Sequence, residues 1–104
     1  MGDENPLNAF IEEGLKLSLA KGYPAAIFRR MVAEYGNVEA VRRLAEADVL
    51  QSGLRELAKL GLLDWSAEAA VGKFPELFPN LLTRESAAFK LRLAHLESEQ
   101  SPSS

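Results

Sequence analysis

The chain has 104 residues, with 12 basic side chains against 15 acidic ones, a formal net charge of −3, and no cysteine. This length suits one domain, and the absence of cysteine excludes disulfides, thiolate nucleophiles and thiolate metal sites. Hydrophobic residues make up 47% and charged residues 26% of the chain, a balance typical of globular proteins that argues against intrinsic disorder.

Leucine and alanine dominate the composition, with 17 and 15 residues against eight β-branched ones. Because β-branched side chains favour strands and Leu and Ala favour helices, the composition predicts an all-α fold. A first helix is expected to begin at Asn5-Pro6, with Asn5 as the cap and Pro6 in the first helical position, and to end at Lys21-Gly22. Its apolar stripe consists of Leu7, Phe10, Ile11 and Leu15.

Glycines separate the next three predicted helices. The second runs from Pro24 to Gly36, the third is capped by Asn37, and the fourth runs from Ser52 as its cap to Gly61. Helical spacing predicts that these helices turn the following side chains toward a core: Ile27, Phe28, Met31, Val32, Tyr35, Val38, Val41, Leu44, Ala45, Leu54, Leu57, Ala58 and Leu60.

The last third of the chain predicts one short and one long helix. Ser66 caps a short helix that stops at Gly72, and Pro75 and Pro79 bracket a single turn. Thr83 is predicted to cap the final helix, whose core-facing stripe is Phe89, Leu93 and Leu96. We therefore expect a compact single-domain bundle of about five to six short helices over residues 5–96, with a flexible N-terminus at 1–4 and a disordered tail at 97–104.

Residues 28–93 resemble a family of small bacterial all-helical proteins of uncharacterised function. The resemblance rests on Tyr35-Gly36-Asn37-Val38-Glu39-Ala40, on Ser52-Gly53-Leu54, and on Gly61-Leu62-Leu63-Asp64-Trp65-Ser66 with Glu68, Ala69 and Val71. It continues through Leu77-Phe78 and Leu82-Thr83 to Glu85, Ala88, Arg92 and Leu93. Trp65 departs from the family pattern, which has an aliphatic residue there. The resemblance implies a helical fold and no catalytic residue, because no activity is associated with the family.

Catalytic and metal-binding patterns are missing from the sequence. His95 is the only histidine, and its position near the end of the last helix suits a favourable interaction with the helix dipole. No nucleophile elbow, phosphate-binding loop, zinc motif or dinucleotide fingerprint occurs. We therefore expect no enzyme, no metal and no cofactor. Glu39, Arg42, Arg43 and Glu46 instead predict a solvated helix face with ion pairs three and four residues apart.

The surroundings of the chain can also be predicted. No run of uncharged residues is longer than seven, whereas a membrane-spanning helix needs about 20 apolar residues. The first four residues, Met1 to Glu4, lack the basic and apolar regions of a secretory signal. We therefore expect a cytoplasmic protein that does not act at a membrane.

Two kinds of partner remain open at this point. Binding to nucleic acid is the alternative function, through a degenerate helix-turn-helix over residues 38–60, although the low pI and the acidic residues near the turn argue against it. Its candidate contacts are the basic residues Arg29, Arg30, Arg42, Arg43, Arg55 and Lys59.

The preferred function is a non-enzymatic protein-interaction module, a regulatory or accessory protein that binds another protein or itself. It rests on large apolar residues that lie off the helical stripes or in connections and could form an exposed patch. The candidate interface consists of Trp65, Phe74, Leu77, Phe78, Leu81 and Leu82. The competing interpretation is that the large rings plug the ends of the bundle, since large apolar groups are usually buried.

Overall fold

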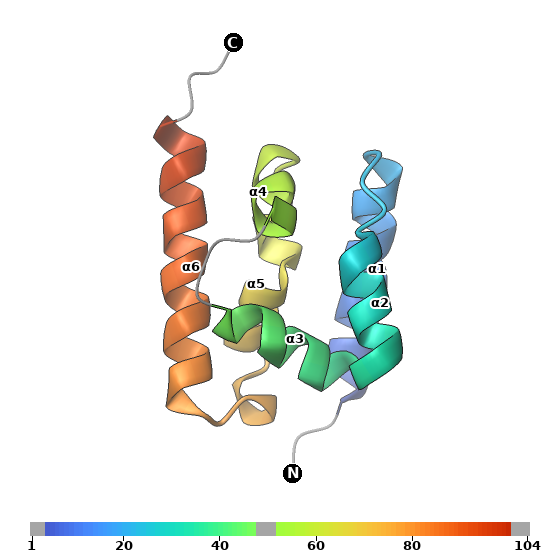
Figure 1. Cartoon of the computed structure of the whole chain (residues 1–104), viewed down its shortest axis with the longest axis vertical. Helices are drawn as coiled ribbons and strands as arrows, with labels where there is room; N and C mark the ends of the chain where they lie inside the picture. The colour runs from blue at the N-terminus through green and yellow to red at the C-terminus, as the bar shows by residue number, and fades with distance from the viewer. Residues whose placement is uncertain (1–3, 48–51, 101–104) are drawn as a thin grey trace.

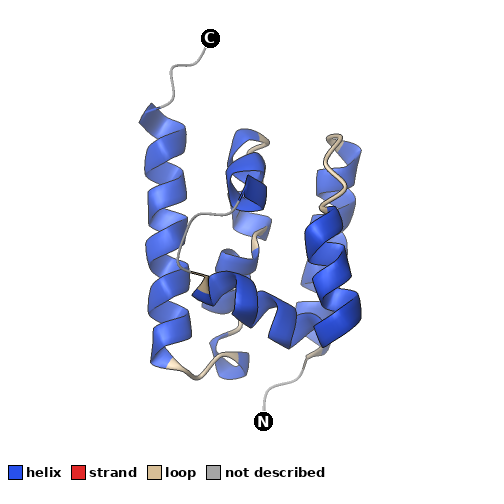
Figure 2. Ribbon diagram, viewed as in Figure 1, coloured by secondary structure: helices blue, strands red, loops and turns tan. Residues whose placement is uncertain are grey.

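The computed structural model describes residues 4–47 and 52–100. Within these ranges the chain forms six α-helices and two short 3-10 helices without any strand, which confirms the predicted all-α fold (Figure 2). The elements are α1 (Asn5–Ala20), α2 (Ala26–Tyr35), α3 (Asn37–Glu46), α4 (Ser52–Lys59), η1 (Leu63–Trp65), α5 (Ala67–Lys73), η2 (Pro75–Leu77) and α6 (Leu81–Gln100).

Helices α3, α5 and α6 pack most extensively on one another and form the centre of the bundle. Figure 1 shows α6 as the outermost helix on one side, α1 and α2 on the opposite side, and α3 crossing between them. Helix α2 packs mainly on α3, and it contains no buried residue. The bundle is therefore tightly packed around α5 and more open around α2.

The hydrophobic core has two parts. The main cluster joins α1, α3, α5 and α6 to the segment around η2, and a smaller one joins α4, η1 and α6. The predicted stripes of the first and third helices supply much of the main cluster. Its buried members are Leu7, Phe10, Ile11, Val41, Ala45, Ala70, Val71, Phe74, Phe78 and Ala87, and the smaller cluster contains Leu54, Leu63 and Ala94.

Gly36 joins α2 to α3 without an intervening loop. Its φ of 85° and ψ of 167° lie in a region open almost only to glycine. This one residue is both the C-terminal cap of α2 and the N-terminal cap of α3, so the prediction that Asn37 caps α3 is wrong. Asn37 is already helical, and its side-chain amide donates a hydrogen bond to Oδ1 of Asn8 on α1.

The other predicted helix ends are partly right. Ser66 caps α5 as predicted, because its hydroxyl accepts a hydrogen bond from the Ala69 N–H at 3.1 Å. Helix α1 begins one residue earlier than expected, at Asn5 with Glu4 as its cap. Helix α2 begins at Ala26 rather than Pro24, because Ala25 adopts a left-handed conformation with φ of 52°. Helix α5 continues through the predicted stop at Gly72 to Lys73, and the predicted Ser52 cap lies outside the described side chains.

Helix α6 differs most from its prediction. It begins at Leu81, where Oδ1 of Asn80 accepts a hydrogen bond from the Leu82 N–H at 2.8 Å. The predicted cap, Thr83, is instead buried within the helix and donates a hydrogen bond to Glu46. The helix also continues to Gln100, so residues 97–100 of the predicted disordered tail are helical. Residues 101–104 lie outside the described part of the chain.

The buried face of α6 is not the predicted apolar stripe. Thr83, Ala87, Lys90 and Ala94 face the core, whereas Phe89 and Leu96 are exposed and Leu93 is half-buried. The stripe prediction for Phe89 and Leu96 is therefore wrong. Ala87 and Ala94 are small enough for close packing, and the longer Lys90 faces inward where it pairs with Glu68 of α5. The second predicted stripe is also incomplete, since Ile27 and Tyr35 of α2 are exposed.

Candidate functional site

The six residues predicted to form a protein interface do not form one surface. Phe74 and Phe78 are buried in the main cluster, so they are core residues and cannot be surface anchors. Phe74 meets the Phe10 ring edge-on, with the ring centres 5.7 Å apart. Their positions agree with the competing interpretation of rings that plug the bundle, because both rings, at the two ends of η2, pack in the main cluster.

The other four candidates are only partly accessible. Trp65 stacks on Phe10 with ring centres 5.0 Å apart, and Leu77 packs against the same cluster, so both are half-buried. Leu81 and Leu82 are exposed at the start of α6. The sequence thus located the exposed apolar surface correctly only at these two leucines.

A larger exposed apolar surface continues from Leu82 along α6. Leu82, Phe89 and Leu96 are 72%, 58% and 45% exposed. They are seven residues apart, and because seven residues are nearly two helical turns, the three side chains form one line, which we call the α6 stripe. Their heptad spacing was visible in the sequence. The sequence did not show whether these side chains face the core or the solvent, because a core-facing stripe has the same spacing.

Two opposite charges border the α6 stripe. Glu85 lies three residues after Leu82, and Arg92 lies three residues after Phe89, so each is a neighbour of the stripe on the helix surface. Both side chains are exposed. In the described part of the chain, neither forms an ion pair. The stripe is therefore flanked on one edge by an acid near its beginning and a base near its middle.

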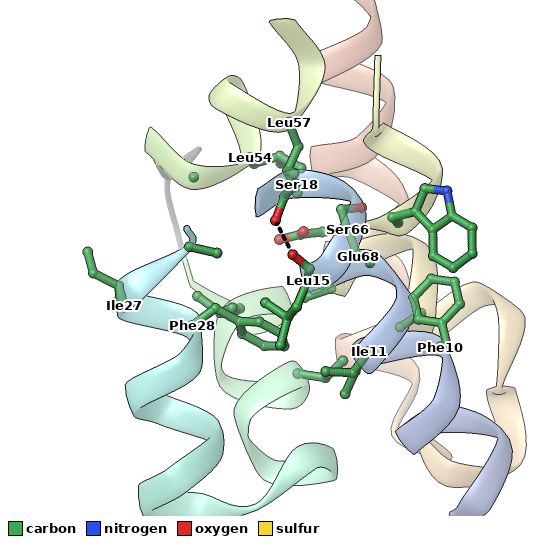
Figure 3. Close-up of a pocket in the computed structure, with 18 of the residues that line it drawn as sticks. Phe10, Ile11, Leu15, Ser18, Ile27, Phe28, Leu54, Leu57, Ser66 and Glu68 are labelled. Atoms are coloured by element: carbon green, nitrogen blue, oxygen red, sulfur yellow. Dashed lines mark hydrogen bonds between the residues drawn. The ribbon is translucent and has the colours of Figure 1, made fainter. Parts of the chain in front are cut away.

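A separate apolar pocket lies between α1, α2, α4 and α5 (Figure 3). Its cavity volume is about 100 Å³, and its mouth is open to solvent. Ile11 and Leu15 of α1, Ile27 and Phe28 of α2, and Leu57 of α4 line it. The exposure of Ile27 follows from this arrangement, since that side chain lies at the edge of the pocket and not in a closed core.

Three of the polar side chains that line the pocket, Ser18, Ser66 and Glu68, already have partners. The Ser18 hydroxyl donates to the Leu15 carbonyl at 3.1 Å, and the Ser66 hydroxyl donates to the Leu63 carbonyl at 2.7 Å. Glu68 is paired through Oε2 with Nζ of Lys90 at 3.0 Å. Burial, together with the nearby Glu56 carboxylate, raises the pKa of Tyr23, so its phenol stays neutral near pH 7.

The Glu68–Lys90 pair is the most deeply buried charge pair of the described residues. The two side chains are 4% and 3% exposed, and Nζ of Lys90 also donates to the carbonyl of Leu44 on α3. The pair therefore links α5, α6 and α3 in the core. Sequence analysis missed it, because a lysine and a glutamate 22 residues apart show no pattern that predicts burial.

The candidate nucleic-acid contacts are spread over three helices, and several are engaged. Arg42 bonds both Glu39 and Glu46, and Nε of Arg43 lies 2.9 Å from Glu39, which confirms the predicted ion-paired face of α3. Hydrogen bonds from Arg42, joined by Arg43, hold the pKa of Glu39 at about 2.

Beyond α3, Nε of Arg55 lies 3.2 Å from Glu97, and Nε of Arg29 donates to the Pro24 carbonyl at 2.8 Å. Arg30 and Lys59 are exposed. The connection over residues 48–51, on which a helix-turn-helix depends, lies outside the described residues. Carboxylates thus pair with three of the six candidate residues, which reduces the positive charge that they could offer to phosphates.

Residues suited to catalysis or metal binding are scattered. His95 is exposed on α6, five residues before the end of that helix. Across residues 4–47 and 52–100, no three His, Asp or Glu side chains come together in a way that could hold a metal ion. Over the same ranges, every helix is too short or too polar to cross a bilayer.

Comparison with known proteins adds no further constraint. No protein-family model, no curated protein and no solved structure matches the chain.

Proposed function

We propose that the chain is a non-enzymatic protein-interaction module that acts through the α6 stripe. The observation that supports this most directly is the exposure of Leu82, Phe89 and Leu96 at heptad spacing on one line of a 20-residue helix. Exposed apolar surfaces of this kind on a small soluble protein typically mark contact sites for other proteins.

The partner we propose for the stripe is a second copy of the chain. Heptad spacing puts the stripe residues at one of the two positions per heptad through which paired helices contact each other along their length. In an antiparallel pair centred on Phe89, Leu82 of each copy lies opposite Leu96 of the other, and the two Phe89 rings meet on the twofold axis. This makes the apolar contact self-complementary, as a twofold interface requires.

Charge complementarity selects the antiparallel direction. In that arrangement Glu85 of one copy lies beside Arg92 of the other, and the symmetry repeats the pair at the other end of the contact. Opposed helix dipoles also favour antiparallel packing. A helix of 20 residues is about 30 Å long and 10 Å wide. The area of one face of such a helix is smaller than the roughly 800 Å² that each partner contributes to a standard interface. We therefore expect a dimer that dissociates on dilution.

Sedimentation equilibrium over a range of protein concentrations tests this function. We expect reversible dimerisation, and we expect Phe89→Lys to remove it, because a charged side chain would then lie on the twofold axis. Ala33→Lys is the matched control, since it adds the same charge at an exposed position on α2. Phe89→Lys should keep the wild-type melting temperature, because the side chain it replaces is outside the core.

The two flanking charges test the direction of the pair. Glu85→Arg alone should weaken dimerisation, because two arginines then face each other across the interface. Glu85→Arg with Arg92→Glu should restore it. A wild-type protein that stays monomeric at hundreds of micromolar would refute the proposed partner, and a double variant no better than the single one would refute the antiparallel direction.

A further inference from the structure

The pocket lined by α1, α2 and α4 leaves open space beside the main cluster. Its cavity volume of about 100 Å³ is several times the roughly 10–15 Å³ that a single water molecule needs, and its mouth is open to solvent. Protein interiors are otherwise packed as densely as organic crystals. A hollow of this size next to the main cluster leaves many apolar atoms without contacts, which favours a molecule that fills it.

The side chains that line the pocket restrict the charge and polarity of a molecule that could bind there. Apolar side chains from α1, α2, α3, α4, η1 and α5 surround it, and the hydroxyls of Ser18 and Ser66 are already bonded to backbone carbonyls. Glu68 adds a carboxylate that is neutralised by Lys90. A ligand with a charge of its own, or with several polar groups, would therefore lose its bonds to water without replacement.

We infer that this pocket binds an uncharged molecule with a single aliphatic chain, whose one neutral polar end lies beside the hydroxyl of Tyr23. Tyr23 is half-buried among the lining residues and offers a donor and an acceptor. Helix α2 provides the wall at Ile27 and Phe28, and because it is held mainly by α3 and has no buried residue, it can shift to admit the chain.

Trp65 makes the binding measurable. It is the only tryptophan of the chain and one of the residues that line the pocket. Titration with 1-octanol should therefore change its fluorescence to saturation with one molecule bound per chain. Octanoate, which has the same chain length and a negative charge, should bind at least tenfold more weakly. Equal or tighter binding of octanoate would overturn the requirement for a neutral ligand.

Two leucine variants show whether the binding is in the pocket. Ser18→Leu places an aliphatic side chain in the space and should abolish the octanol response, because Ser18 is a lining residue whose hydroxyl bonds only its own helix. Ala20→Leu adds the same side chain at an exposed position of α1 and should bind like the wild type. Unchanged octanol binding by Ser18→Leu would overturn the assignment.

Amide chemical shifts of the wild-type protein provide a second measurement if Ser18→Leu fails to fold. Octanol should shift residues of α1, α2 and α4 around the pocket and leave the far side of α6 unchanged. Shifts confined to α6, or no saturable binding up to the solubility of octanol, would overturn the proposal. Phe89→Lys should keep full octanol binding, so the outcome is independent of the dimer.

Discussion

Removal of the buried lysine is the sharpest test of how the core is held together. Lys90→Met keeps a long unbranched side chain but leaves the carboxylate of Glu68, 4% exposed, without its ammonium partner at 3.0 Å. It also removes the donor to the Leu44 carbonyl. Breaking one side of a buried pair costs about 3–5 kcal/mol, and a domain of this size has about 5–15 kcal/mol of stability in total.

Urea unfolding followed by circular dichroism measures this loss. We expect Lys90→Met to lower the free energy of unfolding by at least about 3 kcal/mol, equivalent to a melting temperature more than about 12 °C lower. Arg55→Met is the matched control, because Arg55 and Glu97 form an exposed pair at 3.2 Å. Exposed pairs contribute about 0–1 kcal/mol, so this variant should unfold close to the wild type.

A double variant shows whether Lys90→Met loses stability because the charge of Glu68 is left unpaired or because the lysine itself is missing. In Lys90→Met with Glu68→Met no charge is left buried, and replacing a whole buried pair by apolar side chains is often close to neutral. We therefore expect the double variant to recover at least half of the stability lost by the single one. A Lys90→Met protein that loses no more than Arg55→Met would refute the reasoning, and so would a double variant as unstable as the single one.

Two further predictions concern helix α3 and its connection to α2. Gly36→Ala should cost about 1–3 kcal/mol in urea unfolding, because φ of 85° with ψ of 167° is strained for any residue with a Cβ. Gly72→Ala is its control and should be neutral or stabilising by up to about 1 kcal/mol, since Gly72 lies within α5 with open space around it; equal losses would show that φ at Gly36 is not the cause. Glu39→Gln tests the ion pairs of α3. Because the folded-state pKa of Glu39 is about 2, below its ordinary 4.5, the carboxylate stabilises the fold above pH 4.5 and loses this effect as the pH falls toward 2. Thermal melts should show the variant less stable at pH 6 and equal to the wild type near pH 2, and a difference that does not change with pH would contradict this.

Sequence patterns predicted the structure correctly where it depends on interactions between residues a few positions apart. The hydroxyl of Ser66 bonds an N–H three residues away, so its capping role depends on a few neighbouring residues. The ion pairs of Glu39 with Arg42 and Arg43 likewise lie within a single helix. Gly36 is another such case, since its backbone conformation ends one helix and starts the next.

Patterns failed where a distant partner decides between two local possibilities. Thr83 has the chemistry of a helix cap, but Glu46 on α3 accepts its hydroxyl and draws it into the core. Phe74 and Phe78 lie in an irregular connection that would suit surface anchors, and their contacts with the main cluster bury them. The six interface candidates were therefore only partly accessible, and the exposed stripe proved to extend along α6 instead.

The amino-acid sequence by itself determined that this chain is helical and roughly where its helices lie, because helix propensity, capping and glycine conformation act over a few residues. Only the tertiary structure decided which face of α6 is buried. A stripe of Leu82, Phe89 and Leu96 is equally regular on either side of a helix. Contacts with distant segments turned these large side chains outward, because Ala87 packs in the main cluster, Ala94 packs with Leu54 and Leu63, and Lys90 pairs with Glu68.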